Sequence, residues 1–196
     1  MLKCKLDQRD IKMSKPVESI LLIGDLHIPQ RCTDIPKQFK EIIAPGRVQH
    51  IICVGNFGDR VDWLKSLCSN VHLIQGDYDE GNYPENKLIS VGEWKIGAVH
   101  GHQLIPWGDK EALSSYQRLL DCDVLVYGHT HIPSVESMEN KYFINPGSVT
   151  GAYSSVTSEI NPCFKVLSTQ GKELTVFSYE LEEDELRISQ TQLYKN

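Results

Sequence analysis

Seven histidine, carboxylate and amide side chains follow short apolar runs, and their types suit metal coordination. They stand in GDLH (24–27), GNFGD (55–59), GDYDE (76–80), VHGH (99–102) and VYGHTH (126–131). The candidate ligands are Asp25, His27, Asn56, Asp77, His100, His129 and His131. Imidazole nitrogen and carboxylate oxygen suit Mn, Fe, Zn or similar divalent ions. Seven such groups are enough for two ions that share a bridging ligand, so we expect up to two divalent ions.

The elements that must position these groups alternate between strand-like and helix-like patterns. Apolar runs at 20–24, 50–55 and 71–76 are separated by helix-like segments at 36–43 and 59–68. Runs of Ile, Val and Leu with little alternation are typical of strands buried on both faces of a largely parallel sheet. In an open α/β sheet, ligands collect outside the carboxyl ends of the strands. The polar clusters stand at these ends, so we expect the candidate ligands to converge there.

The rest of the chain indicates a second sheet. The strand-like runs 88–92 and 94–101 are almost contiguous and predict a hairpin. Residues 110–121 carry apolar side chains at helical spacing, and 123–128 returns as a buried strand. Beyond Pro133 the pattern is β-rich, so we expect the C-terminal third to build the second sheet. Together these patterns predict an α/β sandwich.

Composition limits the class of protein. The chain has 196 residues, of which 40% are hydrophobic, which fits one globular domain. Its 20 Lys and Arg against 26 Asp and Glu lack the basic field that nucleic acid or anionic lipid requires. We expect a mobile N-terminal extension at 1–19, where charges mix with weak periodicity, and a single domain at 20–196.

The spacing of the cysteines and the length of the apolar runs indicate the cellular compartment of the protein. The six cysteines are scattered without a CxxC pair, and we interpret them as reduced. The N-terminal segment does not have the pattern of a secretory signal, and no run approaches the roughly 20 apolar residues of a membrane helix. We expect a cytoplasmic protein without direct membrane insertion.

The order of the polar motifs resembles the calcineurin-like metallophosphoesterases over roughly residues 20–181. Within that superfamily the chain is especially similar to the vacuolar protein sorting-associated protein 29 family, the small subunit of retromer. The strings that carry this similarity are GDLHIPQRC (24–32), NYPENK (82–87), GHQLIPWGD (101–109), GHTH (128–131) and NPGSVTGAY (145–153). The resemblance implies an α/β/β/α sandwich of four layers, in which helices flank two mixed sheets.

The resemblance also assigns the ligands to two ions. It implies that one ion is surrounded by Asp25, His27, Asn56 and His131. The other would be surrounded by Asn56, Asp77, His100 and His129. An active enzyme of this superfamily usually has Asp where Asn56 stands and Asn where Asp77 stands. A neutral amide oxygen bridges two cations less well than a carboxylate does, so we expect weakened or less symmetric metal binding.

A third departure concerns catalysis. Enzymes of the superfamily usually carry a His at the position of Tyr78, where it helps to protonate the leaving oxygen. A phenol with a reference pKa near 10 is a poor substitute, and loss of general-acid help typically costs about 10²- to 10⁴-fold. We expect Tyr78 to be a ring over the site mouth rather than a catalytic phenol. His102 is a candidate second imidazole near the site.

Two surfaces are candidates for partner binding. Leu104, Ile105 and Trp107 stand together in one loop; we expect Leu104 to be core and the other two to be candidates for an exposed patch. The resemblance implies that this region and the metal face dock onto the large helical-solenoid subunit of retromer, vacuolar protein sorting-associated protein 35. It also implies an apolar groove for regulator peptides away from the metals, for which Val166, Phe177 and Tyr179 are the candidate lining.

Two functions remain open at this point. The first is a non-catalytic or very weakly catalytic scaffold subunit of retromer in endosome-to-Golgi and endosome-to-plasma-membrane retrograde transport. The resemblance implies that such a subunit is cytoplasmic and peripheral on endosomal membranes through the complex. The second is a metal-dependent phosphodiesterase acting on small phosphodiesters, which the nearly complete ligand set favours.

Overall fold

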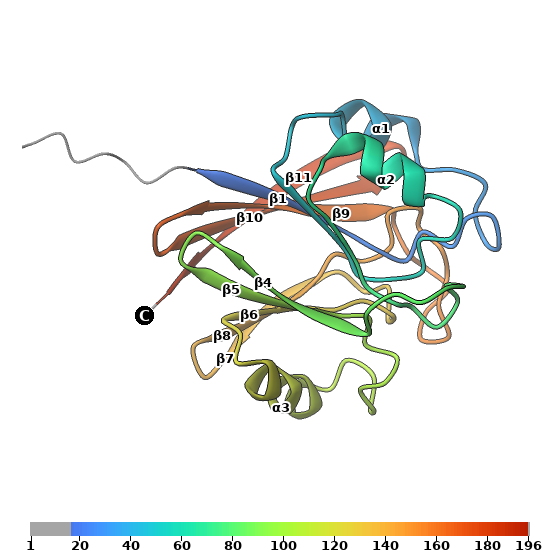
Figure 1. Cartoon of the computed structure of the whole chain (residues 1–196). Helices are drawn as coiled ribbons and strands as arrows, with labels where there is room; N and C mark the ends of the chain where they lie inside the picture. Colours follow the sequence, from blue (N-terminus) through green and yellow to red (C-terminus); the bar gives the residue numbers. More distant parts are fainter. Residues whose placement is uncertain (1–16, 196) are drawn as a thin grey trace, which may run out of the picture.

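Two β-sheets pack face to face, and helices cover their outer faces (Figure 1). The computed structural model describes residues 17–195. Within these residues, the first sheet has the strand order β11-β10-β9-β1-β2-β3 and the second has β4-β5-β6-β8-β7. The strands of the first sheet are β1 (Glu18–Ile23), β2 (His50–Cys53), β3 (Val71–Leu73), β9 (Cys163–Gln170), β10 (Glu173–Glu182) and β11 (Glu185–Tyr194). Those of the second are β4 (Asn86–Val91), β5 (Trp94–Val99), β6 (Val124–Val126), β7 (Ser134–Met138) and β8 (Lys141–Asn145).

Three helices complete the four layers among the described residues. The helices α1 (Lys37–Ile42) and α2 (Val61–Leu67) lie outside the first sheet, and α3 (Lys110–Leu120) lies outside the second (Figure 1). The carboxylate of Asp109 caps α3 by accepting a hydrogen bond from the N–H of Ala112 at 2.9 Å. The expected α/β/β/α sandwich is confirmed.

The strand pairings explain why both sheets are mixed. Strands β1, β2 and β3 are parallel and are connected through α1 and α2. The hairpin expected at 88–101 is the antiparallel pair β4–β5, whose turn contains Gly92 at φ 56°. Because β5, β6 and β8 are parallel, the carboxyl ends of β5 and β6 form a second edge at which side chains can meet.

The expectation that the C-terminal third builds the second sheet is wrong for its last three strands. Strand β9 pairs antiparallel with β1, which places Leu167 opposite Ile20, and β10 and β11 extend the same sheet. The reason is that β9 and β10 bury residues on both faces. Leu167 and Val176 pack between the sheets, whereas Phe164 packs beneath the helices. Alternating hydrophobicity identifies such strands but does not specify the edge to which they add.

Three apolar clusters hold the layers together. The first fills the space between the sheets and includes Trp94, whose indole N–H donates to the carbonyl of Gly171 at 3.1 Å. The second lies between the first sheet and α1 and α2, where the rings of Phe39 and Phe164 meet edge to face at 4.8 Å. The third lies beneath α3 around Leu113. The loops at the strand ends are therefore fixed on a packed scaffold.

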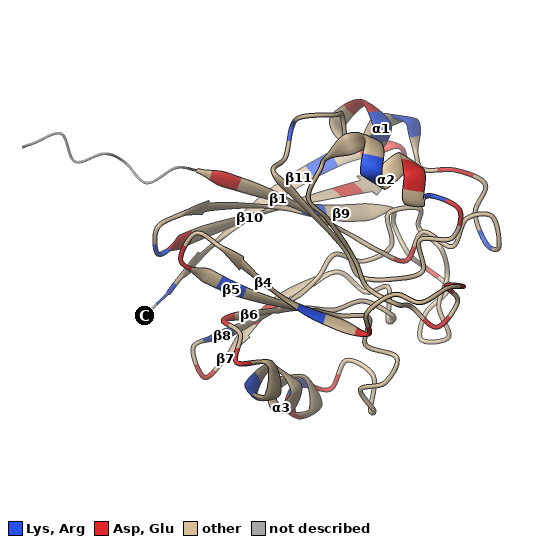
Figure 2. Cartoon of the chain, viewed as in Figure 1, with Lys and Arg blue, Asp and Glu red and all other residues tan. Residues whose placement is uncertain are grey.

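The first strand marks the start of the folded domain among the described residues. Strand β1 begins at Glu18, so Glu18 and Ser19 belong to the sheet rather than to the expected extension, and residues 1–16 lie outside the described residues. Acidic and basic positions are interspersed over both sheets and the helices that cover them (Figure 2). None of the helices in the described part of the chain is long and apolar enough to span a membrane.

One glycine is required where the loops after β1 and β2 touch. Gly58 has φ 57°, and a Cβ there would lie 1.9 Å from the carbonyl oxygen of Ile28. Gly46 has φ 76° but nothing within 4 Å of its Cβ position.

We predict that Gly46→Ala lowers the free energy of unfolding by about 1 kcal/mol through backbone strain. Gly58→Ala should lower it by a further 1–3 kcal/mol or so, because backbone must shift. Equal urea midpoints for the two variants would contradict this interpretation.

Candidate metal centre

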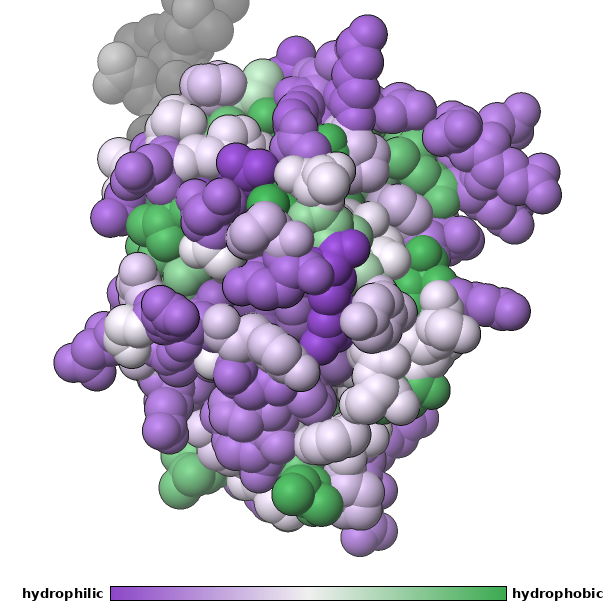
Figure 3. All heavy atoms as spheres, turned by 90° about the vertical axis from the view of Figure 1, so that its right-hand side faces the viewer, coloured by the Kyte–Doolittle hydropathy of each residue, from purple (hydrophilic) through white to green (hydrophobic). Residues whose placement is uncertain are grey.

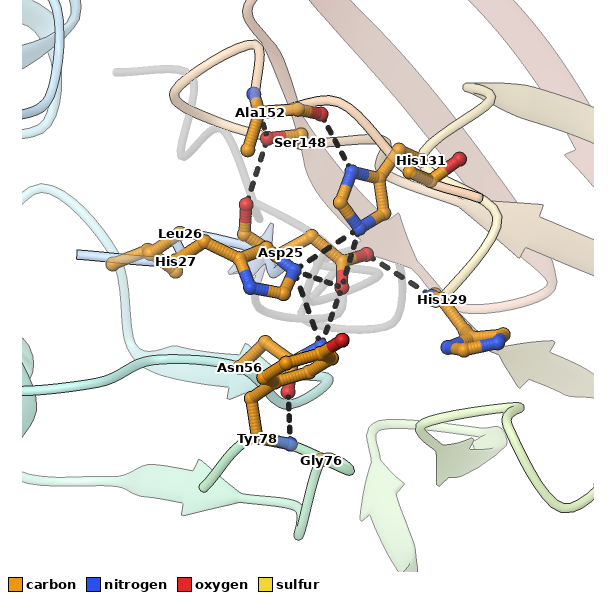
Figure 4. A network of polar contacts seen from close by, with 12 residues as sticks. Asp25, Leu26, His27, Asn56, Gly76, Tyr78, His129, His131, Ser148 and Ala152 are labelled. Atoms are coloured by element: carbon orange, nitrogen blue, oxygen red, sulfur yellow. Dashed lines mark hydrogen bonds and ion pairs between the residues drawn. The ribbon is translucent and has the colours of Figure 1, made fainter. Parts of the chain in front are cut away.

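The seven candidate ligands meet at the carboxyl ends of five strands from both sheets. Asp25 and His27 follow β1, Asn56 follows β2, and Asp77 follows β3. His100 follows β5, and His129 and His131 follow β6. Figure 4 shows the side chains of Asp25, His27, Asn56 and His131 turned toward one another, whereas His129 approaches Asp25 through its backbone N–H, at 3.0 Å. The structure therefore brings together side chains that are up to 106 positions apart in the sequence, as between Asp25 and His131.

The backbone at these strand ends is left-handed. Five of the seven residues have positive φ: Asp25 51°, His27 46°, Asn56 55°, His129 68° and His131 62°. This conformation costs a residue with a Cβ roughly 1–2 kcal/mol. Hydrogen bonds between loops hold it: the N–H of Asp25 donates to Gly55 at 3.0 Å, and that of His27 donates to Asn56 at 2.9 Å. The turns direct successive side chains into the same space, which apolar periodicity could not reveal.

The first group of ligands is fully buried. Asp25 Oδ1 lies 3.3 Å from Nε2 of His131 and 3.9 Å from Nε2 of His27. The two imidazole Nε2 atoms are 3.2 Å apart. His131 Nδ1 donates to the carbonyl of Ala152 at 2.6 Å, which directs Nε2 toward Asp25. Ligand atoms of Asp25, His27 and His131 all lie within 4.8 Å of one another, as a common ion requires.

The second group is more open to solvent. Asp77 Oδ1 lies 3.0 Å from Nε2 of His100 and 3.8 Å from Nδ1 of His129. His100 Nδ1 donates to the carbonyl of Val54 at 2.5 Å. Ligand atoms of Asp77, His100 and His102 lie within 4.8 Å of one another, so His102 joins this group as a further imidazole.

The side chain of Asn56 lies between the two groups. Its Nδ2 is 3.3 Å from Asp25 Oδ1, 3.0 Å from Asp77 Oδ1 and 3.1 Å from His100 Nε2. Its Oδ1 accepts a hydrogen bond from the N–H of Tyr78 at 3.0 Å (Figure 4). Any Cβ at Gly76 would come within 2.3 Å of this oxygen, so the glycine is needed for the approach. Asn56 occupies the bridging position, but its donor group faces the carboxylates.

Asp79 fixes the loop that carries Asn56. Its carboxylate accepts hydrogen bonds from four backbone N–H groups, at distances of 2.6 to 3.2 Å. These donors belong to Asn56, Phe57, Gly58 and Gly76. Asp79 was not among the expected site residues, although GDYDE contains two further acidic residues besides Asp77. It ties the ends of β2 and β3 together.

The protonation states favour a cation. Burial lowers the pKa of His27 to about 4, so this ring is neutral at pH 7 and can serve as a ligand. Although burial opposes ionisation, hydrogen bonds from His100 and Asn56, together with the nearby ring of His129, hold the pKa of Asp77 far below its usual range. Although burial also opposes protonation of His100, its hydrogen bond to Asp77 and the charge of Asp25 raise its pKa, so an ion bound at this ring would have to displace a proton. Although burial opposes ionisation of Asp25 as well, its hydrogen bond with His131 and the nearby imidazole charges lower its pKa, so both carboxylates remain ionised among the imidazoles.

The donor set fits divalent ions. Nε2 of His27 faces the carboxylate of Asp25, and Nδ1 of His129 faces that of Asp77. A mixture of imidazole nitrogen and carboxylate oxygen suits Zn, Mn or similar ions, which would bind as Lewis acids here. The two groups of ligands would hold two neighbouring ions, with the side chain of Asn56 between them.

Aromatic side chains surround the mouth of a hollow of about 400 Å³ above the ligands. Tyr78 is 51% exposed and meets the ring of His27 edge to face at 5.3 Å, as expected for a ring over the site mouth. The guanidinium of Arg31 lies between the rings of Tyr78 and Tyr153, at 4.7 and 4.9 Å from their centroids. Arg31 and Tyr153 could not be identified from the sequence as neighbours, because their contact joins loops that are 122 residues apart.

The loop at 101–109 extends from this mouth to the surface. Leu104 is partly buried beneath α3, as expected, whereas Ile105 is 76% and Trp107 45% exposed. The indole of Trp107 packs edge to face on His129 at 4.5 Å. Figure 3 shows this end of the molecule as a largely hydrophilic face with separate apolar areas. Ile105 therefore offers an exposed apolar side chain beside the candidate ligands.

The second expected surface lies on the outer face of the first sheet. Phe177 pairs with Val166, and Tyr179 pairs with Phe164, with its ring stacked on that of Phe164 at 4.6 Å. Val166, Phe177 and Tyr179 thus share one face of β9 and β10, the face on which α1 and α2 pack. Val166 also lines a small apolar hollow with residues of the α1 region.

The sequence of this chain matches those of known proteins. A family model described as the calcineurin-like phosphoesterase superfamily domain matches residues 19–172. Vacuolar protein sorting-associated protein 29 from Schizosaccharomyces pombe is 35% identical over 183 residues, which cover 90% of this chain and 98% of that protein. This chain belongs to the vacuolar protein sorting-associated protein 29 family.

Solved structures of family members agree with the fold. Vps29 from Entamoeba histolytica, solved in complex with Zn²⁺, is 42% identical, with a TM-score of 0.84 over 89% of this chain and 98% of that one. Vps29 from Chaetomium thermophilum, solved with the RaPID-derived cyclic peptide RT-D3, is 31% identical. It has a TM-score of 0.82 and covers 92% of this chain and 98% of that one. A zinc ion and a peptide are thus bound by two relatives.

The bridging position provides a test of the centre. In Asn56→Asp, a carboxylate can face both groups and still accept the N–H of Tyr78, so we predict at least about tenfold tighter Zn²⁺ binding by calorimetry. Without ions the same variant should unfold at lower temperature at pH 7, because three carboxylates then converge. Asn140→Asp, in an exposed turn between β7 and β8, is the matched control and should change neither value. Unchanged Zn²⁺ affinity in Asn56→Asp would exclude a bridging role.

Proposed function

We propose that this protein is the small subunit of retromer and serves as a docking scaffold in endosome-to-Golgi and endosome-to-plasma-membrane retrograde transport. The observation that carries the proposal is the loop at 101–109, where Ile105 is 76% exposed beside the candidate metal centre. Family membership supports the assignment to retromer. In this role the protein is cytoplasmic and peripheral on endosomal membranes through the complex.

The partner at this face is vacuolar protein sorting-associated protein 35, the helical-solenoid subunit. Ile105 supplies an apolar anchor, and Trp107 next to it is held on His129. Burying an exposed Ile side chain contributes about 1.5–3 kcal/mol. A partner seated here also covers the mouth of the hollow, so that a substrate-type pocket becomes part of an interface.

Weak catalysis is consistent with the residues over the centre. Tyr78 stands where a general acid is needed, and its ring packs on His27 and Arg31. A neutral phenol provides no positive charge at pH 7. Asn56 supplies an amide rather than a carboxylate between the two groups. Both features favour a structural role for bound ions, which would fix the strand-end loops that carry the docking surface.

A second docking surface is proposed for peptides of regulators. Val166, Phe177 and Tyr179 share the outer face of β9 and β10, on the side of the sheet that faces away from the second sheet. The peptide bound by the relative from Chaetomium thermophilum supports peptide recognition in the family. Apolar strand residues of this kind provide pockets for alternate side chains of an extended segment.

A negative charge introduced at Ile105 tests the proposed docking surface. We predict that Ile105→Asp reduces binding to the purified solenoid subunit by at least about 30-fold, because a carboxylate would be desolvated at the interface centre. Leu119→Asp is the matched control, since Leu119 is 75% exposed on α3, and it should bind as the wild type does. Wild-type affinity of Ile105→Asp, measured by calorimetry, would exclude this loop as the anchor.

The alternative function, a metal-dependent phosphodiesterase, is favoured by the converging ligand groups. Two ions held by Asp25, Asp77 and the histidines would polarise a phosphodiester and lower the pKa of bound water. The missing feature is a general acid. Activity would then be low in this chain and would rise when an imidazole is restored at position 78.

This alternative predicts a gain of function. With Mn²⁺, Tyr78→His should hydrolyse bis-p-nitrophenyl phosphate more than about tenfold faster than the wild type, as general-acid help is worth about 10²- to 10⁴-fold. Asp25→Ala in the same background should abolish the gain, whereas Tyr78→Phe should leave the basal rate unchanged. If Tyr78→His is no faster and Asp25→Ala retains the parental rate, the observed hydrolysis belongs to a contaminant.

A further inference from the structure

Two histidines and a carboxylate meet at the opposite end of the first sheet. Glu18 is the first residue of β1, His50 the first of β2, and His72 lies in β3. These strands are parallel, so the three residues stand at their amino ends, whereas the candidate metal centre lies at their carboxyl ends. His50 pairs with Ile20, which packs between the sheets. The group therefore lies on the face that is turned toward the second sheet.

The two imidazoles face each other edge to edge. His50 Nδ1 lies 3.4 Å from His72 Nε2, the ring centroids are 5.7 Å apart, and the ring planes differ by 13°. The distance between the ring centroids exceeds the distance between the two nitrogens by about twice the distance from a ring centroid to one of its own nitrogens. Both nitrogens must therefore lie near the line that joins the centroids, with the rings nearly coplanar. Two lone pairs that face each other in this way require a proton or a metal ion between them.

Neighbouring groups assign the remaining protons. Glu18 Oε2 lies 3.7 Å from His50 Nε2, an ion-pair distance, and its negative charge favours the tautomer with the proton on that nitrogen and with Nδ1 as an acceptor or ligand. His72 Nδ1 is buried and has no hydrogen-bond partner among residues 17–195. Burial, with smaller contributions from Lys87 and His50, lowers the pKa of His72 to about 4, so its ring is neutral at pH 7. Neutral imidazoles are the form that binds metal.

The facing nitrogens form a hydrogen bond in this structure, and their separation also equals that of two nitrogens on one tetrahedral metal ion. Two Zn–N bonds of about 2.0–2.1 Å at the tetrahedral angle place their nitrogens about 3.3–3.4 Å apart. The observed separation is 3.4 Å. A carboxylate on the far nitrogen of a ligating histidine is a common feature of such sites, because it fixes the tautomer and the ring orientation. Glu18 stands in that position relative to His50.

We propose that His50 and His72 form a binding site for a divalent transition-metal ion of the imidazole-preferring kind, Zn²⁺ or Cu²⁺, with Glu18 orienting His50. The ion is held by Nδ1 of His50 and Nε2 of His72 after each ring turns by about 35°, so that the two lone pairs meet at one point beside the N···N line, and water completes its coordination. The proton on the facing edge of His72 moves to Nδ1, so the ring stays neutral. Both rings are only partly exposed, and Lys87 is the nearby cation that opposes the ion.

Imidazole signals in NMR spectra of the full chain test this site independently of the candidate metal centre. On titration with ZnCl₂, the ring C–H signals of both His50 and His72 should shift together in the wild type. In His72→Gln the signal of His50 should not respond at tenfold higher Zn²⁺. Lys87→Ala should lower the midpoint several-fold, because a like charge is removed.

Several results would overturn the proposal. One is the absence of a shift at Zn²⁺ concentrations that move His100 and His131. Another is an unchanged response of His50 in His72→Gln, because a single histidine would then bind alone. Anomalous diffraction at the zinc edge adds a direct measurement, in which density between the two rings should be present in the wild type and lost in His72→Gln. Density confined to the strand carboxyl ends would count against the site.

Discussion

The left-handed backbone at the strand ends is the constraint on which the candidate centre depends. Five ligand positions have φ between 46° and 68°, and each departs from the region that a residue with a Cβ prefers. The extended strands on either side are held by the apolar cluster between the sheets, so the turns cannot relax without breaking that packing. The loops also brace one another, because Ser148 Oγ donates to the carbonyl of Asp25 at 2.7 Å and accepts the N–H of Ala152 at 2.9 Å. Packing energy far from the centre thus maintains its geometry.

The centre is asymmetric, and this asymmetry links chemistry to docking. Asp25, His27 and His131 are buried, whereas Asp77 and His102 are accessible from the mouth of the hollow. The accessible side is continuous with the loop that exposes Ile105, since Trp107 contacts His129 and donates to the carbonyl of His102 at 3.0 Å. The indole ring of Trp107 therefore contacts both the second group of ligands and the loop of the proposed interface.

Much of the fold and of the candidate centre could be predicted from the sequence because strand ends and polar clusters coincide. The sequence pattern of GDLH and GHTH places Asp25 and His131 correctly at two strand ends, but the contact itself depends on how two sheets stack. The edge to which β9 adds was not predictable, since a strand with two apolar faces fits either sheet. Arg31 and Tyr153 carry no periodic signal, and their contact exists only after the loops have folded. Family resemblance supplied the pairing of ligands to ions, which spacing alone leaves open.

The sequence separation of the ligands has a consequence for how the chain opens. The ligands come from β1, β2, β3, β5 and β6, so no single hairpin or helix–strand unit contains enough of them to hold an ion. Local fraying of α3 or of the β10–β11 edge can occur while the centre persists, but separation of the two sheets must destroy it. Ions that bind only the native arrangement would then raise the free energy of global opening and leave local opening unchanged. In amide hydrogen exchange, a chelator would selectively accelerate the slowest amides, those of the strands between which the ligands converge.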